Sequence, residues 1–245
     1  MKSSTVKSQP NTSYNPDINR DLYKSEYNPD LTSNEPIDNL VIRDHTVAKS
    51  IYEKFCACIN KDEAVKWRNQ LVYEIAVHSL AEEIILYPVI KSDLPNGEFL
   101  YNQSIQEHRQ LKDDLYKAQN LDPSNLEFRS RVKIVMEDLI KHIEKEEKEI
   151  LPLLDKHVPM NRRIELGGQF ERRKLIVPTK PHPSAPDEPS IANSIISILT
   201  APVDKFRDLF TSFPDQQKVI DLKKDAQSKS TVNVGSEKYP SSSQM

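Results

Sequence analysis

Apolar residues recur every three to four positions from Pro36 to about Asn60, and again from Asn60 to Pro88. This spacing puts them on one face of a helix, so the sequence predicts two consecutive amphipathic helices. Pro36 suits a first helical turn, and Asn60 can cap the second helix. The inward positions are Leu40, Ile42, Val47, Ile51 and Phe55 in the first helix, and Trp67, Leu71, Ile75 and Ile85 in the second.

The same pattern returns in the next segment. A turn over residues 92–97 leads to a third helix over about 98–120. Asp122-Pro123 is expected to open a fourth helix, capped by Ser124 and reaching Pro152. Short connections join antiparallel neighbours, so the predicted fold is all-α, an antiparallel up-down four-helix bundle. A proline costs about 3 kcal/mol in mid-helix, so the second and fourth helices should kink or finish near theirs.

Composition divides the rest of the chain. Residues 1–33 are rich in Ser, Asn, Pro and Tyr and predict a disordered arm. The bundle with one trailing helix should occupy residues 34–176, and a proline-rich linker residues 177–189. Residues 190–213 have helical apolar spacing and are expected to form an amphipathic extension that packs back on the bundle. Ser, Lys and Gln dominate residues 214–245, where a mostly disordered tail is expected.

The charge balance limits the classes of partner. With 34 basic and 37 acidic residues the net charge is −3, which argues against nucleic acid binding. No apolar run approaches the roughly 18 residues of a membrane-spanning helix, and no secretory signal is evident, so a cytoplasmic protein without a membrane anchor is expected. Cys56 and Cys58 are too close on a helix to bond each other, which is typical of a reducing compartment.

Histidine and glutamate repeat at one interval. His45 is followed by His78-x-x-x-Glu82, and His108 by His142-x-x-x-Glu146. His45 and His108 are 63 residues apart, and the other pairs are 64 apart, as are Pro88 and Pro152. Residues four apart lie on one helix face, which here is the apolar face. Six ionisable groups would therefore meet inside the core.

Unpaired buried polar groups cost about 1–3 kcal/mol each, so such a core needs cations or water. Imidazole and carboxylate suit iron, manganese or zinc, and iron is favoured here. The predicted ligands are His45, His78, Glu82, His108, His142 and Glu146. The alternative is a metal-free helical scaffold in which the histidines are hydrogen-bonded and the glutamates solvated.

Further residues keep the register of the repeat. Asp44 precedes His45 as Glu107 precedes His108. Glu74 and Asp138 lie one turn before the second histidine of each set, where they either accept its ring N–H or pair with Lys or Arg at the surface. Tyr52 lies seven residues after His45 and Tyr101 seven residues before His108, so each shares a helix face with its histidine and either borders a small-molecule pocket or belongs to the core.

These motifs resemble the hemerythrin-like (HHE cation-binding) family over about residues 36–175. The resemblance is carried by Arg43-Asp44-His45, His78-Ser-Leu-Ala-Glu82-Glu83, Leu86-Tyr87-Pro88, Glu107-His108-Arg109, His142-Ile-Glu-Lys-Glu146 and Ile150-Leu151-Pro152. It implies a non-haem di-iron centre held by the six residues named above. Oxygen-carrying members use five histidines, whereas four histidines and two glutamates are more similar to members that sense iron or oxygen or repair iron centres.

Three functions follow from this reading. The first is a di-iron protein that responds to oxygen, peroxide, nitric oxide or iron, with a diatomic molecule or peroxide as its ligand. The second is a redox enzyme that reduces nitric oxide or peroxide or repairs iron centres. The third is the metal-free scaffold, and no protein partner is indicated.

Overall fold

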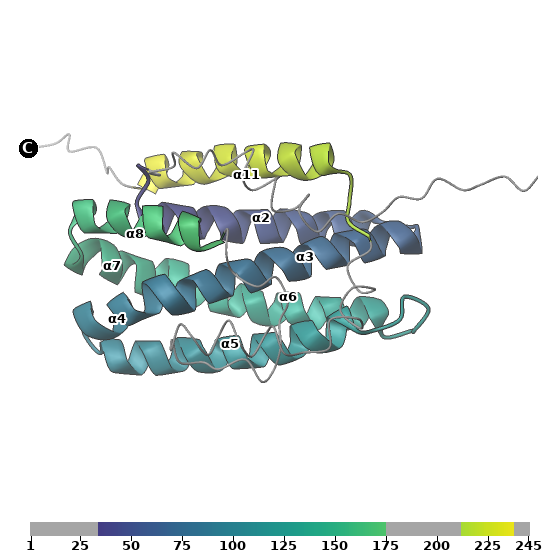
Figure 1. Cartoon of the computed structure of the whole chain (residues 1–245), viewed down its shortest axis with the longest axis horizontal. Coiled ribbons are helices and arrows are strands. Elements are labelled where there is room, and N and C mark those ends of the chain that lie inside the picture. The colour runs from purple at the N-terminus through teal and green to yellow at the C-terminus, as the bar shows by residue number, and fades with distance from the viewer. Residues whose placement is uncertain (1–33, 175–211, 238–245) are drawn as a thin grey trace, which may run out of the picture.

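The computed structural model describes residues 34–174 and 212–237, and the regular elements in these two segments are all helical. The four long helices are α2 (Ile37–Ala57), α3 (Lys61–Ala81), α5 (Gly97–Gln119) and α6 (Phe128–Lys145). They lie side by side (Figure 1), with α2 against α3, α3 against α5, and α5 against α6. The expected antiparallel four-helix bundle is confirmed.

Two helices change their winding before their proline. α3 continues through a π-helical turn, η1 (Glu82–Leu86), into α4 (Tyr87–Asp93), and α6 continues through η2 (Glu146–Ile150) into α7 (Leu151–His157). Pro88 and Pro152 fall in the first turn of α4 and α7, where a missing N–H is tolerated. The α-helical bonding thus finishes before each proline, as expected. A proline ring would clash with the carbonyl four residues earlier, and the wider π turn relieves that clash.

The fourth helix begins later than the sequence predicts. Ser124 does not cap it, because Asp122 Oδ1 accepts hydrogen bonds from both the N–H and the hydroxyl of Ser124. Asn125 Oδ1 likewise accepts from the N–H of Glu127. These local side-chain bonds hold residues 122–127 in turns, and α6 starts only at Phe128.

Two helices of the described segments lie outside the bundle. α8 (Met160–Lys174) is the expected trailing helix and packs on α2 and α3. α11 (Gln216–Glu237) lies along the outside of α2 (Figure 1) and corrects the expectation of a mostly disordered tail after residue 213. Its buried Val219, Leu222 and Ala226 form a narrow apolar stripe at helical spacing. Packing of that stripe stabilises a helix whose Lys- and Gln-rich composition alone would not.

The other flanking expectations are only partly covered by the described residues. The arm at 1–33, the linker at 177–189 and all but the end of the 190–213 extension lie outside them. Of that extension, Phe213 packs edge-on against Tyr73, and Asn69 donates a hydrogen bond to the Ser212 carbonyl. In the part of the chain that is described, no helix is long and apolar enough to cross a membrane.

The apolar core of the described residues has two large clusters and a small one, in which Phe213 packs against Tyr73 and Val77. One large cluster surrounds Phe55 and Trp67 and includes the stripe of α11, and the other surrounds Tyr87 and Phe170. The residues of one cluster give way to those of the other near the midpoints of α2 and α5, and at the ends of α3 and α6, beside η1 and η2. A polar layer separates the two clusters at that level.

Candidate metal centre

The polar layer contains all six residues predicted from the repeat. His45 comes from α2, His78 from α3, Glu82 from the start of η1, His108 from α5, His142 from α6 and Glu146 from the start of η2. All six are buried, and both glutamates are fully so. The structure therefore brings together every candidate ligand, from four helices.

Potential ligand atoms form two groups that share a glutamate. His45, His78, Glu82 and Glu146 make one group, and Glu82, His108 and His142 make the other. Within each group the ligand atoms lie within 4.8 Å of one another. Two ions could therefore be held side by side.

Each glutamate lies between histidines of both groups. Glu82 Oε2 is 3.2 Å from His78 Nε2 and 3.6 Å from His108 Nε2. Glu146 Oε2 is 3.4 Å from both His45 Nε2 and His142 Nε2. Each glutamate could therefore contact ions held by either pair of histidines.

A carboxylate fixes the orientation of every histidine ring. Each ring nitrogen Nδ1 faces a carboxylate oxygen, which accepts a hydrogen bond from its N–H. Nε2 is therefore the ring nitrogen available to a metal ion. The Nδ1–oxygen distances are 2.9 Å for His45 to Glu147, 3.4 Å for His78 to Asp44, 2.9 Å for His108 to Glu83 and 2.8 Å for His142 to Glu107. All four Nε2 atoms point inward as a result.

A lysine lies close to each of these four carboxylates. Lys49 Nζ lies 3.7 Å from Glu147, Lys112 2.8 Å from Glu83, Lys145 2.9 Å from Glu107 and Lys174 2.8 Å from Asp44. Burial raises the pKa of Asp44, but Lys174 and His78 outweigh it and hold that pKa well below its usual range. The carboxylates thus remain ionised and keep their hold on the rings.

For Glu74 and Asp138 the sequence left two roles open, orienting a ring or pairing with Lys or Arg, and neither acid orients a ring. Glu74 instead pairs with Lys223 at 2.8 Å, and Asp138 pairs with Lys141 at 2.8 Å. The signal was available, because the position of Asp44 relative to His45 is repeated at Glu107. The periodicity within a single helix could not show that each acid accepts a hydrogen bond from a ring on a neighbouring helix.

Several buried polar atoms at the centre have no hydrogen-bond partner among the described residues. Inward-facing atoms without a hydrogen-bond partner in the described structure are His45 Nε2, His78 Nε2, both Glu82 oxygens and Glu146 Oε2. The Nε2 atoms of His108 and His142 face each other at 3.1 Å, although both rings already donate from Nδ1. Two lone pairs at that distance repel unless a proton or a metal ion lies between them. The donor set therefore fits a pair of metal ions.

Protons occupy part of this role when no metal is bound. Burial and the charge of Glu146 raise the pKa of Glu82 well above its usual value, since two adjacent buried carboxylates cannot both be ionised. Burial lowers the pKa of His142, but Glu146 and Glu107 outweigh it and raise that pKa to about 9. Burial lowers the pKa of His78 to about 4.

A tyrosine that the sequence analysis passed over also reaches the centre. The fully buried Tyr87 has its hydroxyl 2.8 Å from His108 Nε2, and it donates a hydrogen bond to Glu146 Oε1 at 3.1 Å. Of the two tyrosines considered earlier, Tyr52 stacks on Phe55, and Tyr101 lies under the ammonium of Lys91. Tyr87 was missed because an α-helix would turn it away from Glu82, and only η1 brings it back.

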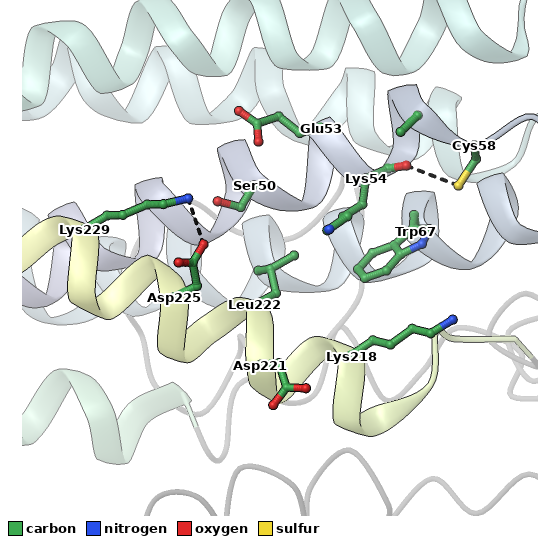
Figure 2. A pocket seen from close by; sticks show the side chains of 11 residues that line it. Ser50, Glu53, Lys54, Cys58, Trp67, Lys218, Asp221, Leu222, Asp225 and Lys229 are labelled. Carbon is green, nitrogen blue, oxygen red and sulfur yellow. Dashed lines mark hydrogen bonds and ion pairs between the residues drawn. The ribbon is translucent and has the colours of Figure 1, made fainter.

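A separate groove lies between α11 and the α2–α3 pair (Figure 2). It encloses about 660 Å³ and has Trp67 in its wall. Its charged lining alternates in sign, with Lys54, Lys218 and Lys229 among Glu53, Asp221 and Asp225, and Lys229 pairs with Asp225 at 2.7 Å. None of the six buried candidate ligands lines it, so it is distinct from the polar layer.

Comparison with known proteins agrees with this geometry. Residues 37–154 match the family model described as the hemerythrin HHE cation-binding domain. An uncharacterized hemerythrin-like protein of Schizosaccharomyces pombe is 35% identical over 179 residues, which are 73% of this chain and 88% of that protein. A DNA nickase of a Nostoc species is 20% identical over 138 residues, 56% of this chain and 39% of that protein. No solved structure matches.

Proposed function

Because the chain belongs to the hemerythrin HHE cation-binding family, we propose that it is a non-haem di-iron protein. The family's domains bind a metal, typically iron, and the buried histidines and glutamates fit a metal site. The proposed ligands are His45 and His78 for one ion, His108 and His142 for the other, and Glu82 and Glu146 as bridges between them.

The observation that carries this proposal is the placement of the two glutamates. Each has an oxygen within 3.6 Å of the Nε2 atoms of histidines from both pairs, without a hydrogen bond that explains its burial. A metal-free scaffold could compensate these carboxylates only through protons on Glu82 and His142, and it would leave buried carboxylate oxygens without a hydrogen bond, at a cost of about 1–3 kcal/mol each. Two bridged cations remove that cost.

The proposed role is a response to oxygen, peroxide, nitric oxide or iron supply. Two histidines and two shared carboxylates per ion leave coordination positions for a small molecule, and ferrous iron supplies electrons to such a ligand when it is bound. The chain's own contribution is to hold the rings through their carboxylates and to exclude bulk water with the two apolar clusters.

Metal analysis tests the proposal. Protein reconstituted with ferrous iron and desalted should contain about two iron ions per chain and, after oxidation in air, show the charge-transfer bands of an oxo-bridged ferric pair. The double variant His78→Ala/His142→Ala should lose the iron. His157→Ala, which removes an exposed histidine outside the repeat, is the matched control and should keep it.

Turnover separates a sensor from an enzyme. Consumption of many equivalents of peroxide or nitric oxide per chain, with an electron donor present, would indicate an enzyme. Loss of helicity on chelation, measured by circular dichroism and without turnover, would indicate a sensor. Iron absent from the reconstituted wild-type chain would contradict both.

A further inference from the structure

Tyr87 is placed like a ligand of one ion rather than like a core aromatic. Its oxygen lies 2.8 Å from His108 Nε2, 3.5 Å from His142 Nε2 and 3.1 Å from Glu146 Oε1. These three atoms come from two other segments of the chain and all belong to candidate ligands. The phenol therefore points at the centre of the donor set around His108 and His142.

These distances match the spacing of donors that share an ion. Donor atoms each about 2.1 Å from one metal lie about 3.0 Å apart when their bonds are at right angles. The two Nε2 atoms of His108 and His142 are 3.1 Å apart, and the phenol oxygen keeps similar distances to both. The hydroxyl already occupies the position that a further ligand would take.

The π turn is what delivers this oxygen. Five residues along an α-helix correspond to about 140° of rotation, which would put Tyr87 on a different face from Glu82. In η1 the N–H of Tyr87 instead donates to the carbonyl of Glu82, five residues earlier. That bond stacks Tyr87 over Glu82, so that both side chains enter the same layer.

The other half of the repeat has no such group. Tyr87 plus 64 residues is Leu151, whose N–H makes the corresponding bond to the Glu146 carbonyl in η2. Leu151 is buried, and its side chain has no donor atom. Two π turns of the same kind therefore deliver a phenol at one position and a hydrocarbon at the other.

We propose that Tyr87 is a seventh protein ligand, bound to the ion between His108 and His142. The ion between His45 and His78 consequently keeps the open positions and is where the small molecule binds. This inference rests on the proposed di-iron centre, and it makes the two ions chemically different.

Spectroscopy of the oxidised protein tests the ligand. With ferric iron bound, the wild-type chain should show a tyrosinate-to-iron charge-transfer band in the visible region and the phenolate ring modes in resonance Raman spectra. Tyr87→Phe should lose both signals completely while keeping about two iron ions per chain. Tyr101→Phe, a half-buried tyrosine over which Lys91 lies, is the control and should keep both.

Isotope labelling makes the test independent of any variant. Wild-type protein grown with ring-deuterated tyrosine should show shifted phenolate modes when excited in the charge-transfer band. Iron bound at full content with no phenolate signal would overturn the role of Tyr87 and leave the di-iron proposal intact. Absence of iron would overturn the di-iron proposal itself.

Azide, as a probe of the open position, tests the difference between the ions. Azide added to the oxidised wild-type chain should produce its own charge-transfer band while the tyrosinate band persists. Loss of the tyrosinate band in proportion to azide binding would show that azide displaces Tyr87, which would overturn the assignment of the open position to the ion between His45 and His78.

Discussion

The two helical hairpins, α2–α3 and α5–α6, build nearly the same half-site. In each, the first helix supplies a histidine, the acid before it and a lysine one turn after it, at Lys49 and Lys112. The second helix supplies a histidine, a glutamate and the acid that follows the glutamate. The acids cross between helices, so that each hairpin orients one ring of its own and one ring of its partner.

The hairpins differ at a position where the second has a lysine and the first does not. Lys145 stabilises Glu107 in the second hairpin, but the residue 64 positions earlier is Ala81. α8 fills that role from outside the repeat, because its Lys174 lies 2.8 Å from Asp44. Phe170 of the same helix contacts the His78 ring. The comparison teaches that α8 is part of the centre, although it supplies no ligand.

The largest expected effect comes from breaking what the hairpins share. Glu82→Gln removes a bridging carboxylate, so both ions lose a ligand, and iron content should fall from about two to well under one per chain. His45→Ala removes a ligand of one ion only and should leave about one. Metal analysis after desalting measures both. Equal losses in the two variants would contradict the bridging geometry.

The second largest effect is expected from Lys174, which pairs with Asp44, in comparison with Lys145, which pairs with Glu107. Lys174→Met removes the ammonium that pairs with the partly buried Asp44 and with Glu171, which keeps only Arg43 among the described residues, and should lower the unfolding free energy of the metal-free chain by about 3 kcal/mol. Lys145→Met should cost about 1 kcal/mol or less, because Glu107 is partly solvated. Urea unfolding of the two variants measures this difference.

Iron affinity shows whether Lys174 acts through His78. In Lys174→Met, Asp44 is held less firmly against the His78 ring, so the affinity for iron should fall by about tenfold. Competition with a chelator measures it. Lys174→Arg keeps the charge and should restore most of it. Full affinity in Lys174→Met, despite its lower stability, would make α8 a purely structural support.

The same residues show how much of the fold and of the site can be predicted from the sequence. The six candidate ligands and the bundle follow from two periodicities, 3.6 residues and 64 residues, because ligand and core positions both depend on helix phase. Asp44 and Glu83 were not recognised as partners of the rings, since their contacts cross between helices. Tyr87 was missed because local winding, which a uniform helix period ignores, decides where it points.

The tail shows a second kind of failure. Composition predicted disorder after residue 213, and most of α11 is indeed polar. Its buried Val219, Leu222 and Ala226 are enough because they meet an apolar surface on α2 and α3 that is already formed. Such a helix is stabilised by tertiary packing, which composition does not report.

The smallest expected effect on the centre comes from a change in α11. This helix packs on the same hairpin as α8, but against the cluster around Phe55 and Trp67. Leu222→Ala should lower the unfolding free energy by about 2 kcal/mol, because it opens a cavity beside the cluster around Phe55 and Trp67. Iron content and the visible spectrum should not change, since α11 contributes none of the carboxylates or lysines around the rings. A change in the spectrum at unchanged iron content would mean that α11, like α8, is coupled to the metal layer. The contrast between the two added helices would then be wrong.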